Sequence, residues 1–134
     1  MNNTISSSIP ALLLRGATVI VTGIIAVASL SPQVPAVATG ISDKVDHLAA
    51  YACLGFLLTL DWSRRTSGPV IMAAGAATGA MLELLQALVP GRQPDWGDVA
   101  VNTMGVLAGW LLASVLRRMA RRGAWPDLSR RAGP

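Results

Sequence analysis

The fold of this chain is decided by the stretch ELLQALVPGRQPDWGDVAVN, residues 83–102. The stretch begins at the end of one apolar segment and finishes at the start of the next, and its central prolines and glycine are typical of a turn between two helices. Glu83 and Gln86 precede this turn, and Asp98 and Asn102 follow it. Two apolar helices joined in this way bring all four polar residues to the same end of the fold.

The rest of the chain has the composition of a membrane protein. Only 13% of its 134 residues are charged and 52% are hydrophobic, whereas a soluble domain carries about a quarter charged residues. A helix needs ~20 apolar residues to cross a hydrocarbon core of ~30 Å, and backbone groups in lipid must be satisfied within the segment. We therefore predict an all-α, four-helix transmembrane bundle as one domain, residues 1–122, with a flexible basic tail, residues 123–134. The predicted spans are residues 11–30, 45–60, 69–89 and 99–116.

The arginines predict the orientation of the bundle. Arg64 and Arg65 lie between the second and third spans, and four more arginines follow the fourth span closely. The positive-inside rule then places both termini in the cytoplasm and the two remaining loops outside. The alternative is that the first segment is a cleaved signal peptide, with Ala36-Val37-Ala38 as the cleavage site. The absence of lysine and arginine from the first nine residues favours a retained helix.

The same charges and the cysteine content exclude other classes of protein. The net charge is +4, but the arginine clusters adjoin apolar spans and belong to no nucleic-acid-binding motif. We therefore expect the lipid bilayer, and no nucleic acid, as a partner. Cys53 is the only cysteine, so an intramolecular disulfide is impossible.

Polar residues next to the apolar spans form a candidate site at the outer face. Ionisable groups within lipid are costly, so they usually mark either a buried network or a working site. On helices, residues three or four apart share one face, as Asp43, His47 and Tyr51 do. The candidate catalytic residues are His47, Glu83 and Asp98, and the candidate ligand-binding residues are Asp43, Lys44, Asp46, Tyr51, Gln86, Arg92 and Asn102. Together they predict a polar pocket that opens outward.

Each of these residues also has a purely structural interpretation. Asp95 and Asp98 could be helix caps, Lys44 and Arg92 could neutralise neighbouring acids, and His47 could be a structural hydrogen-bonded histidine. Glu83 is harder to explain in purely structural terms, because a carboxylate inside a span needs a cation, a proton or several donors. We expect its partner to be His47, Lys44 or Arg92.

The sequence contains no signature of a metal or cofactor site. Oxygen and imidazole ligands from Asp43, Asp46, His47 and Glu83 could suit a divalent ion, but their spacing matches no specific motif such as HExxH. No glycine-rich phosphate loop is present, and no serine or cysteine is paired with His47 in an evident way. We therefore predict no metal site and assign no cofactor.

These motifs, taken in order, resemble the VanZ-like family of small bacterial membrane proteins. The resemblance extends over residues 43–116, and the first span also resembles the family. It implies a helical integral membrane protein of the cell envelope, in a family named for a protein linked to teicoplanin resistance, and it supplies no reaction. The motifs that carry it are Asp43-Lys44-x-x-His47-x-x-x-Tyr51-x-x-Leu54-Gly55-Phe56, Glu83-x-x-Gln86, Pro90-Gly91-Arg92, Asp98, Asn102 and Gly105-x-x-x-Gly109.

Three functions are compatible with the sequence. The first is an envelope protein whose outward pocket binds an anionic or sugar-bearing lipid or precursor, with Lys44 and Arg92 receiving a phosphate. The second is a hydrolase or transferase acting on a lipid-linked phosphate, with His47 as acid or base and Glu83 or Asp98 orienting it. The third is a structural or partner-binding bundle. The sequence determines neither the oligomeric state nor the ligand.

Overall fold

The computed structural model describes residues 3–31, 43–62, 66–92 and 94–121. All regular secondary structure in these ranges is helical, which confirms the predicted all-α bundle. The predicted tail at residues 123–134 and the alternative cleavage site at Ala36–Ala38 lie outside the described residues. The four helices are α1 (Asn3–Leu30), α2 (Asp43–Trp62), α3 (Gly68–Gln86) and α4 (Trp96–Arg121).

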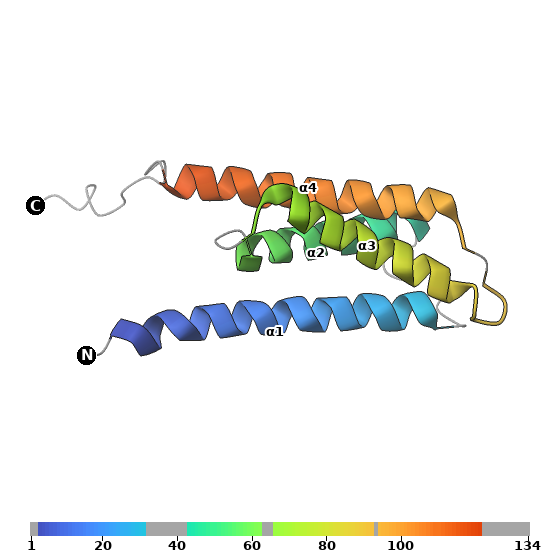
Figure 1. The fold of residues 1–134 in the computed structure, drawn as a ribbon, viewed down its shortest axis with the longest axis horizontal. Coiled ribbons are helices and arrows are strands. Elements are labelled where there is room, and N and C mark those ends of the chain that lie inside the picture. The colour runs from blue at the N-terminus through green and yellow to red at the C-terminus, as the bar shows by residue number, and fades with distance from the viewer. Residues whose placement is uncertain (1–2, 32–42, 63–65, 93, 122–134) are drawn as a thin grey trace, which may run out of the picture.

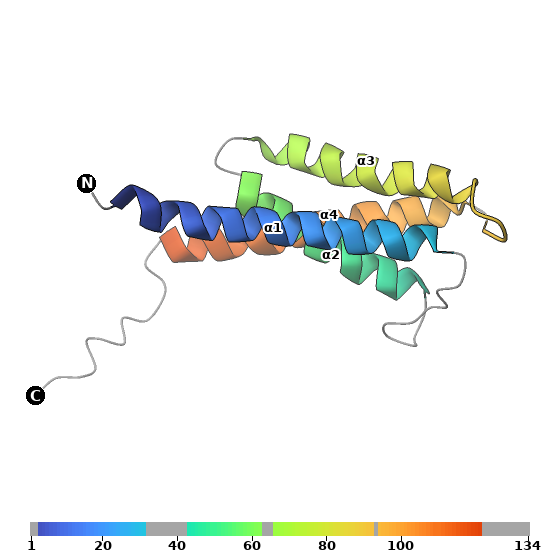
Figure 2. The ribbon, with the colours of Figure 1, turned by 90° about the horizontal axis from the view of Figure 1, so that it is seen from below.

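The helices run up and down along one long axis. The start of α1 and the end of α4 lie at one end of the molecule, and the end of α3 and the start of α4 lie at the other (Figures 1 and 2). The start of α2 lies at this second end as well. The candidate residues at the start of α2, the end of α3 and the start of α4 are therefore gathered at one end, as the turn in residues 83–102 requires.

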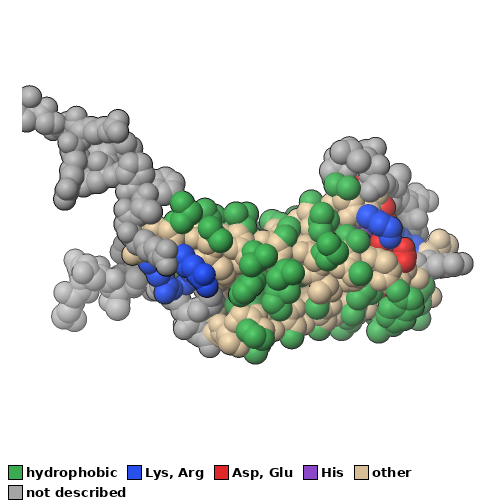
Figure 3. Space-filling model, turned by 90° about the horizontal axis from the view of Figure 1, so that it is seen from above, with side chains coloured by type: hydrophobic (Ala, Val, Ile, Leu, Met, Phe, Trp, Pro, Cys, Tyr) green, Lys and Arg blue, Asp and Glu red, His purple; other side chains and the backbone are tan. Residues whose placement is uncertain are grey.

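The surface between the two ends is apolar. Large hydrophobic side chains are widely exposed there, for example Leu12 at 71%, Val19 at 71% and Val27 at 72%. In Figure 3, lysine and arginine atoms gather at both ends of the visible face, carboxylates accompany them at one end, and hydrophobic side chains occupy the middle. Large continuous apolar surfaces are rare on soluble monomers and are expected where lipid covers the protein.

Among the described residues, three helices are long and apolar enough to cross a membrane, namely residues Ala11–Leu30, Gly68–Gln86 and Trp96–Arg121. Helix α2 does not belong to this group although it has 20 residues. Its first turn carries Asp43, Lys44 and Asp46, which lower its hydropathy. The polar residues that make α2 a candidate part of a site therefore also lower its hydropathy.

Helices α2 and α4 pack with their backbones in close contact because glycine lies between them. A Cβ atom on Gly105 would lie 2.7 Å from the carbonyl oxygen of Leu48, and one on Gly109 would overlap the carbonyl oxygen of Ala52. Small residues one turn apart allow this approach in lipid, where packing and not water drives helix association. The Gly105-x-x-x-Gly109 motif thus holds the start of α4 against the start of α2.

Helix α3 ends at Gln86, three residues before the predicted end of the third span. Beyond it the chain makes short-range bonds, such as the N–H of Val89 to the carbonyl of Gln86 at 2.9 Å. A proline disfavours helical backbone in the residue before it, and Gly91 follows with a φ of 83°, which suits a residue without a Cβ. Glu83 consequently lies in the last turn of α3.

Candidate functional site

Lys44 joins the start of α2 to the start of α4. Its Nζ donates to Oδ2 of Asp95 at 3.0 Å and to Oδ1 of Asp98 at 3.1 Å. The two carboxylates raise the pKa of Lys44, Asp95 more than Asp98. Asp98 is only 8% exposed, so it faces the bundle and is more than a helix cap. Lys44 is thus already shared between two acids.

Asp95 behaves as the cap of α4. Its Oδ1 accepts a hydrogen bond from the backbone N–H of Gly97 at 2.7 Å, and its backbone carbonyl accepts from the N–H of Asp98. A side-chain oxygen that satisfies a free N–H of the first turn is the usual role of an N-cap residue. The N–H of Gly97, followed by the ammonium of Lys44, holds the pKa of Asp95 below its ordinary value. The structural interpretation therefore holds for Asp95.

His47 lies on α2 and contacts one residue of α4 and one of its own helix. Its Nδ1 is 3.0 Å from Oδ1 of Asn102, and its Nε2 is 3.8 Å from Oδ2 of Asp43. Its ring lies parallel to that of Tyr51, one turn further along α2, with centroids 6.5 Å apart. With the amide of Asn102 in this orientation, Nδ1 donates to Oδ1, and Nε2 forms an ion pair with Asp43 when the ring is protonated.

Glu83 is buried, with 2% of the residue exposed. Its Oε2 accepts a hydrogen bond from the backbone N–H of Asp95 at 3.3 Å. It makes no ion pair with Lys44 or with Arg92 in the described part of the chain, because Lys44 pairs with two aspartates instead. Of the three partners expected for Glu83, His47 is near enough to interact with its charge, and the hydrogen bond to Glu83 comes from the backbone of the turn that follows α3.

Three buried donor groups lie in the same region without a partner among the described residues. They are the hydroxyl of Tyr51, Nε2 of Gln86 and Nδ2 of Asn102, and these residues are 1%, 3% and 1% exposed. A Cβ on Gly79 would lie 3.2 Å from the Tyr51 ring and 3.3 Å from Nδ2 of Asn102, so glycine leaves room where α3 faces both side chains. We call His47, Tyr51, Glu83, Gln86 and Asn102 the polar layer.

The remaining candidates lie at the edge of the polar layer. Asp46 is half-buried in the first turn of α2. Arg92 is half-buried in the turn before α4, where its backbone N–H donates to the carbonyl of Val89 at 3.1 Å. The sequence indicated which residues share this end, but it did not indicate the pair formed by His47 and Asn102, which are 55 positions apart.

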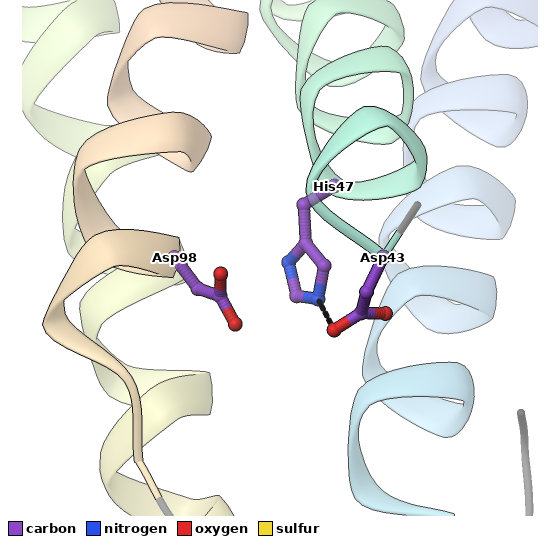
Figure 4. A group of neighbouring side chains, drawn as sticks. All are labelled: Asp43, His47 and Asp98. Carbon is purple, nitrogen blue, oxygen red and sulfur yellow. Dashed lines mark ion pairs between the residues drawn. The ribbon is translucent and has the colours of Figure 1, made fainter. Parts of the chain in front are cut away.

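One group of side chains in the described part of the chain could hold a metal ion. Asp43, His47 and Asp98 each offer one ligand atom, and these three atoms all lie within 4.8 Å of one another. Figure 4 shows Asp43 and His47 on α2 and Asp98 on α4, with their polar ends turned toward one space. The group shares Asp43 and His47 with the set considered from the sequence, and it contains Asp98 in place of Asp46 and Glu83.

The helical bundle and the order of these polar residues agree with the comparison to known families. The profile of the VanZ/LLP1 family matches residues 6–117. The chain belongs to the VanZ/LLP1 family. No curated protein and no solved structure matches it. As a VanZ/LLP1 protein with three helices able to cross a bilayer, it is a membrane protein, and the predicted resemblance is confirmed.

Proposed function

We propose that this VanZ/LLP1 protein crosses the bacterial cytoplasmic membrane several times and binds an anionic or sugar-bearing envelope lipid at its polar layer. The two termini then face the cytoplasm and the polar layer faces outward, because arginines concentrate at the end of the bundle opposite to the polar layer. Helix α2 crosses as well, with its exposed polar first turn at the outer surface and with α1, α3 and α4 all packed against it.

The observation that carries this proposal is the set of three unpartnered donors. A buried donor without an acceptor costs about 1–3 kcal/mol, so three in one layer are costly unless a ligand or water supplies acceptors. The hydroxyl of Tyr51 and the amides of Gln86 and Asn102 come from three different helices. Hydroxyl oxygens of a sugar and phosphate oxygens are acceptors of the kind that such a convergent set recognises.

The charges around the layer favour a headgroup that carries hydroxyls over a bare phosphate. Lys44 already pairs with Asp95 and Asp98, and Glu83 adds a further negative charge next to the donors. Arg92 is then the cation with which a phosphate could pair at the edge of the layer. A lipid with both a sugar and a phosphate satisfies the donors and Arg92 together.

The test is the identity and affinity of bound lipid. Protein extracted in mild detergent is analysed by native mass spectrometry for co-purified lipid, and the delipidated protein is then titrated with a glycosylated polyprenyl phosphate and with phosphatidylglycerol. We expect the glycosylated lipid to bind more tightly, and Tyr51→Phe to weaken it about five- to tenfold. Thr59→Val, which removes a buried hydroxyl bonded to its own helix at Gly55, is the matched control and should bind as the wild type does.

The outcomes separate the three possible functions. Equal affinity for both lipids, or no effect of Tyr51→Phe, contradicts recognition by the polar layer. Product formation that is lost in His47→Gln while lipid still binds would identify an enzyme. Absence of both binding and turnover would leave the structural bundle.

Cysteine labelling tests the proposed orientation. In a Cys53→Ala background, which removes the exposed native thiol, a Gln33→Cys variant should react with a membrane-impermeant maleimide added to intact cells. Ser67→Cys should react only after the membrane is opened. The reverse pattern would place the polar layer on the cytoplasmic side.

A further inference from the structure

We propose that Asp43, His47 and Asp98 form a binding site for one divalent transition-metal ion at the outer edge of the polar layer. The two carboxylates and the imidazole come from two helices that Gly105 and Gly109 hold in close contact. A ligand set assembled from rigid helices is more precise than one on loops. Because the ion is measured without lipid, the site can be tested whether or not the proposed lipid binding is correct.

The orientation of His47 is the first argument for an ion. Its Nδ1 lies 3.0 Å from Oδ1 of Asn102, and its Nε2 faces the carboxylate of Asp43 (Figure 4). The distance of 3.8 Å between Nε2 and Oδ2 of Asp43 is longer than a hydrogen bond. Nε2 can meet this carboxylate either as the partner of an ion pair, when the ring is protonated, or through a cation that both groups bind. Metal-binding histidines show this pattern, in which the other ring nitrogen donates to an oxygen that fixes the ring.

The burial of Asn102 is a further observation on the same contact. Asn102 is 1% exposed, its amide points at the ring of His47, and its Nδ2 has no partner among the described residues. An apolar side chain in its place would remove the unpartnered Nδ2 but would leave Nδ1 of His47 without its acceptor. Its burial next to His47 is explained if its task is to hold the imidazole for a ligand.

Local charge is the second argument. Asp43, Asp98 and Glu83 lie near His47, and Lys44 is shared between Asp98 and Asp95. The carboxylates outnumber the cations in this part of the structure, and Glu83 and Asp98 are both buried. A divalent ion would reduce this excess where the carboxylates lie closest together.

The geometry requires only small movements. In a tetrahedral site with bonds of ~2.1 Å the ligand atoms lie about 3.4 Å apart, and the three atoms here lie within 4.8 Å of one another. Asp43 can supply the adjustment, because its side chain is 61% exposed. One imidazole and two carboxylates favour an ion such as Zn²⁺ or Mn²⁺ over Ca²⁺, which prefers oxygen ligands alone. Solvent or a phosphate oxygen can complete the coordination.

The effect of Lys44 on the metal affinity tests the proposal, because the proposal predicts whether the affinity rises or falls when Lys44 is removed. Lys44 competes with the ion for Asp98, and its positive charge repels a dication nearby. Removing it in Lys44→Gln should therefore tighten metal binding, by about fivefold at physiological ionic strength. A lysine that merely braced the site would have the opposite effect, because its loss would weaken binding.

Spin-echo spectroscopy of bound Mn²⁺ can show directly whether the His47 side chain binds the ion. The chain contains one histidine, so ¹⁴N modulation from imidazole in protein freed of any histidine tag must come from His47. The detergent-solubilised, chelator-treated protein is titrated with Mn²⁺ and, by calorimetry, with Zn²⁺. We expect one ion per chain, imidazole modulation, and at least tenfold weaker binding in His47→Gln and Asp43→Asn.

The matched control is Asp95→Asn. Like Asp43→Asn, it removes one negative charge near the site, here from a carboxylate that pairs with Lys44. Asp95 is not one of the three ligands, so the metal affinity should change by no more than about threefold. Asp43 is exposed, so Asp43→Asn is informative even if Asp98→Asn does not fold. Absence of stoichiometric binding of both ions, absence of imidazole modulation, or equal losses in Asp43→Asn and Asp95→Asn would each overturn the proposal.

Discussion

Replacing Tyr51 by phenylalanine should stabilise the ligand-free protein while weakening its affinity for ligand. The substitution removes one oxygen and keeps the ring that lies parallel to His47. That oxygen is buried and has no hydrogen-bond partner among the described residues. Most buried hydroxyls stabilise a protein through their bonds, so the opposite sign is diagnostic here.

The magnitude follows from the cost of an unpartnered group. A buried donor without a partner costs about 1–3 kcal/mol, and a net hydrogen bond is worth about 0.5–1.5 kcal/mol. Tyr51→Phe should therefore raise the free energy of unfolding of delipidated protein by about 1 kcal/mol or more. Thr59 is equally buried at 1%, but its hydroxyl donates to the carbonyl of Gly55 at 2.6 Å. Thr59→Val should accordingly lower the free energy of unfolding by about 0.5–1.5 kcal/mol.

The assay is reversible unfolding in mixed micelles, with the fraction of denaturing detergent as the variable and circular dichroism as the signal. The same two variants are then compared with saturating lipid, where the advantage of Tyr51→Phe should shrink or reverse because the wild-type hydroxyl is now bonded. If Tyr51→Phe destabilises the delipidated protein as much as Thr59→Val does, the hydroxyl is satisfied at rest and the reasoning behind the polar layer is wrong.

Three further predictions follow from the same structure. Glu83→Gln keeps an acceptor for the N–H of Asp95 but loses the charge, so membrane abundance should stay near normal while lipid binding per folded molecule falls; unchanged binding would remove Glu83 from the site. Gly109→Ala should cost about 1–3 kcal/mol by forcing α2 and α4 apart, whereas Gly23→Ala, where a Cβ meets nothing within 4 Å, should be neutral or stabilising in the same unfolding assay. The pKa of Asp95 is lower in the folded protein than its ordinary value of 3.8, so its contribution to stability is present above that pH and is lost as the pH falls through the lowered pKa. Unfolding measured between pH 2 and about pH 5 should show a shallower dependence on pH in Asp95→Asn, and an unchanged slope would contradict this.

The amino-acid sequence alone was sufficient for the helical class, the membrane setting and the end at which the polar residues meet. These properties depend on the length of apolar runs, on the need to satisfy backbone groups in lipid and on the turn within residues 83–102, and all three are local. The same holds for Asp95, because a cap acts within one turn of its own helix.

The partners of the polar side chains were decided by the tertiary structure. Lys44 and Asp98 are 54 positions apart, and His47 and Asn102 are 55 apart, so their contacts depend on how far each helix is rotated about its axis. That rotation is set by the close approach of α2 and α4 at Gly105 and by packing on every side, which no short stretch encodes. For this reason the sequence left His47, Lys44 and Arg92 as possible partners of Glu83, whereas in the folded chain Lys44 joins α2 to α4 and the backbone N–H of Asp95 bonds to Glu83.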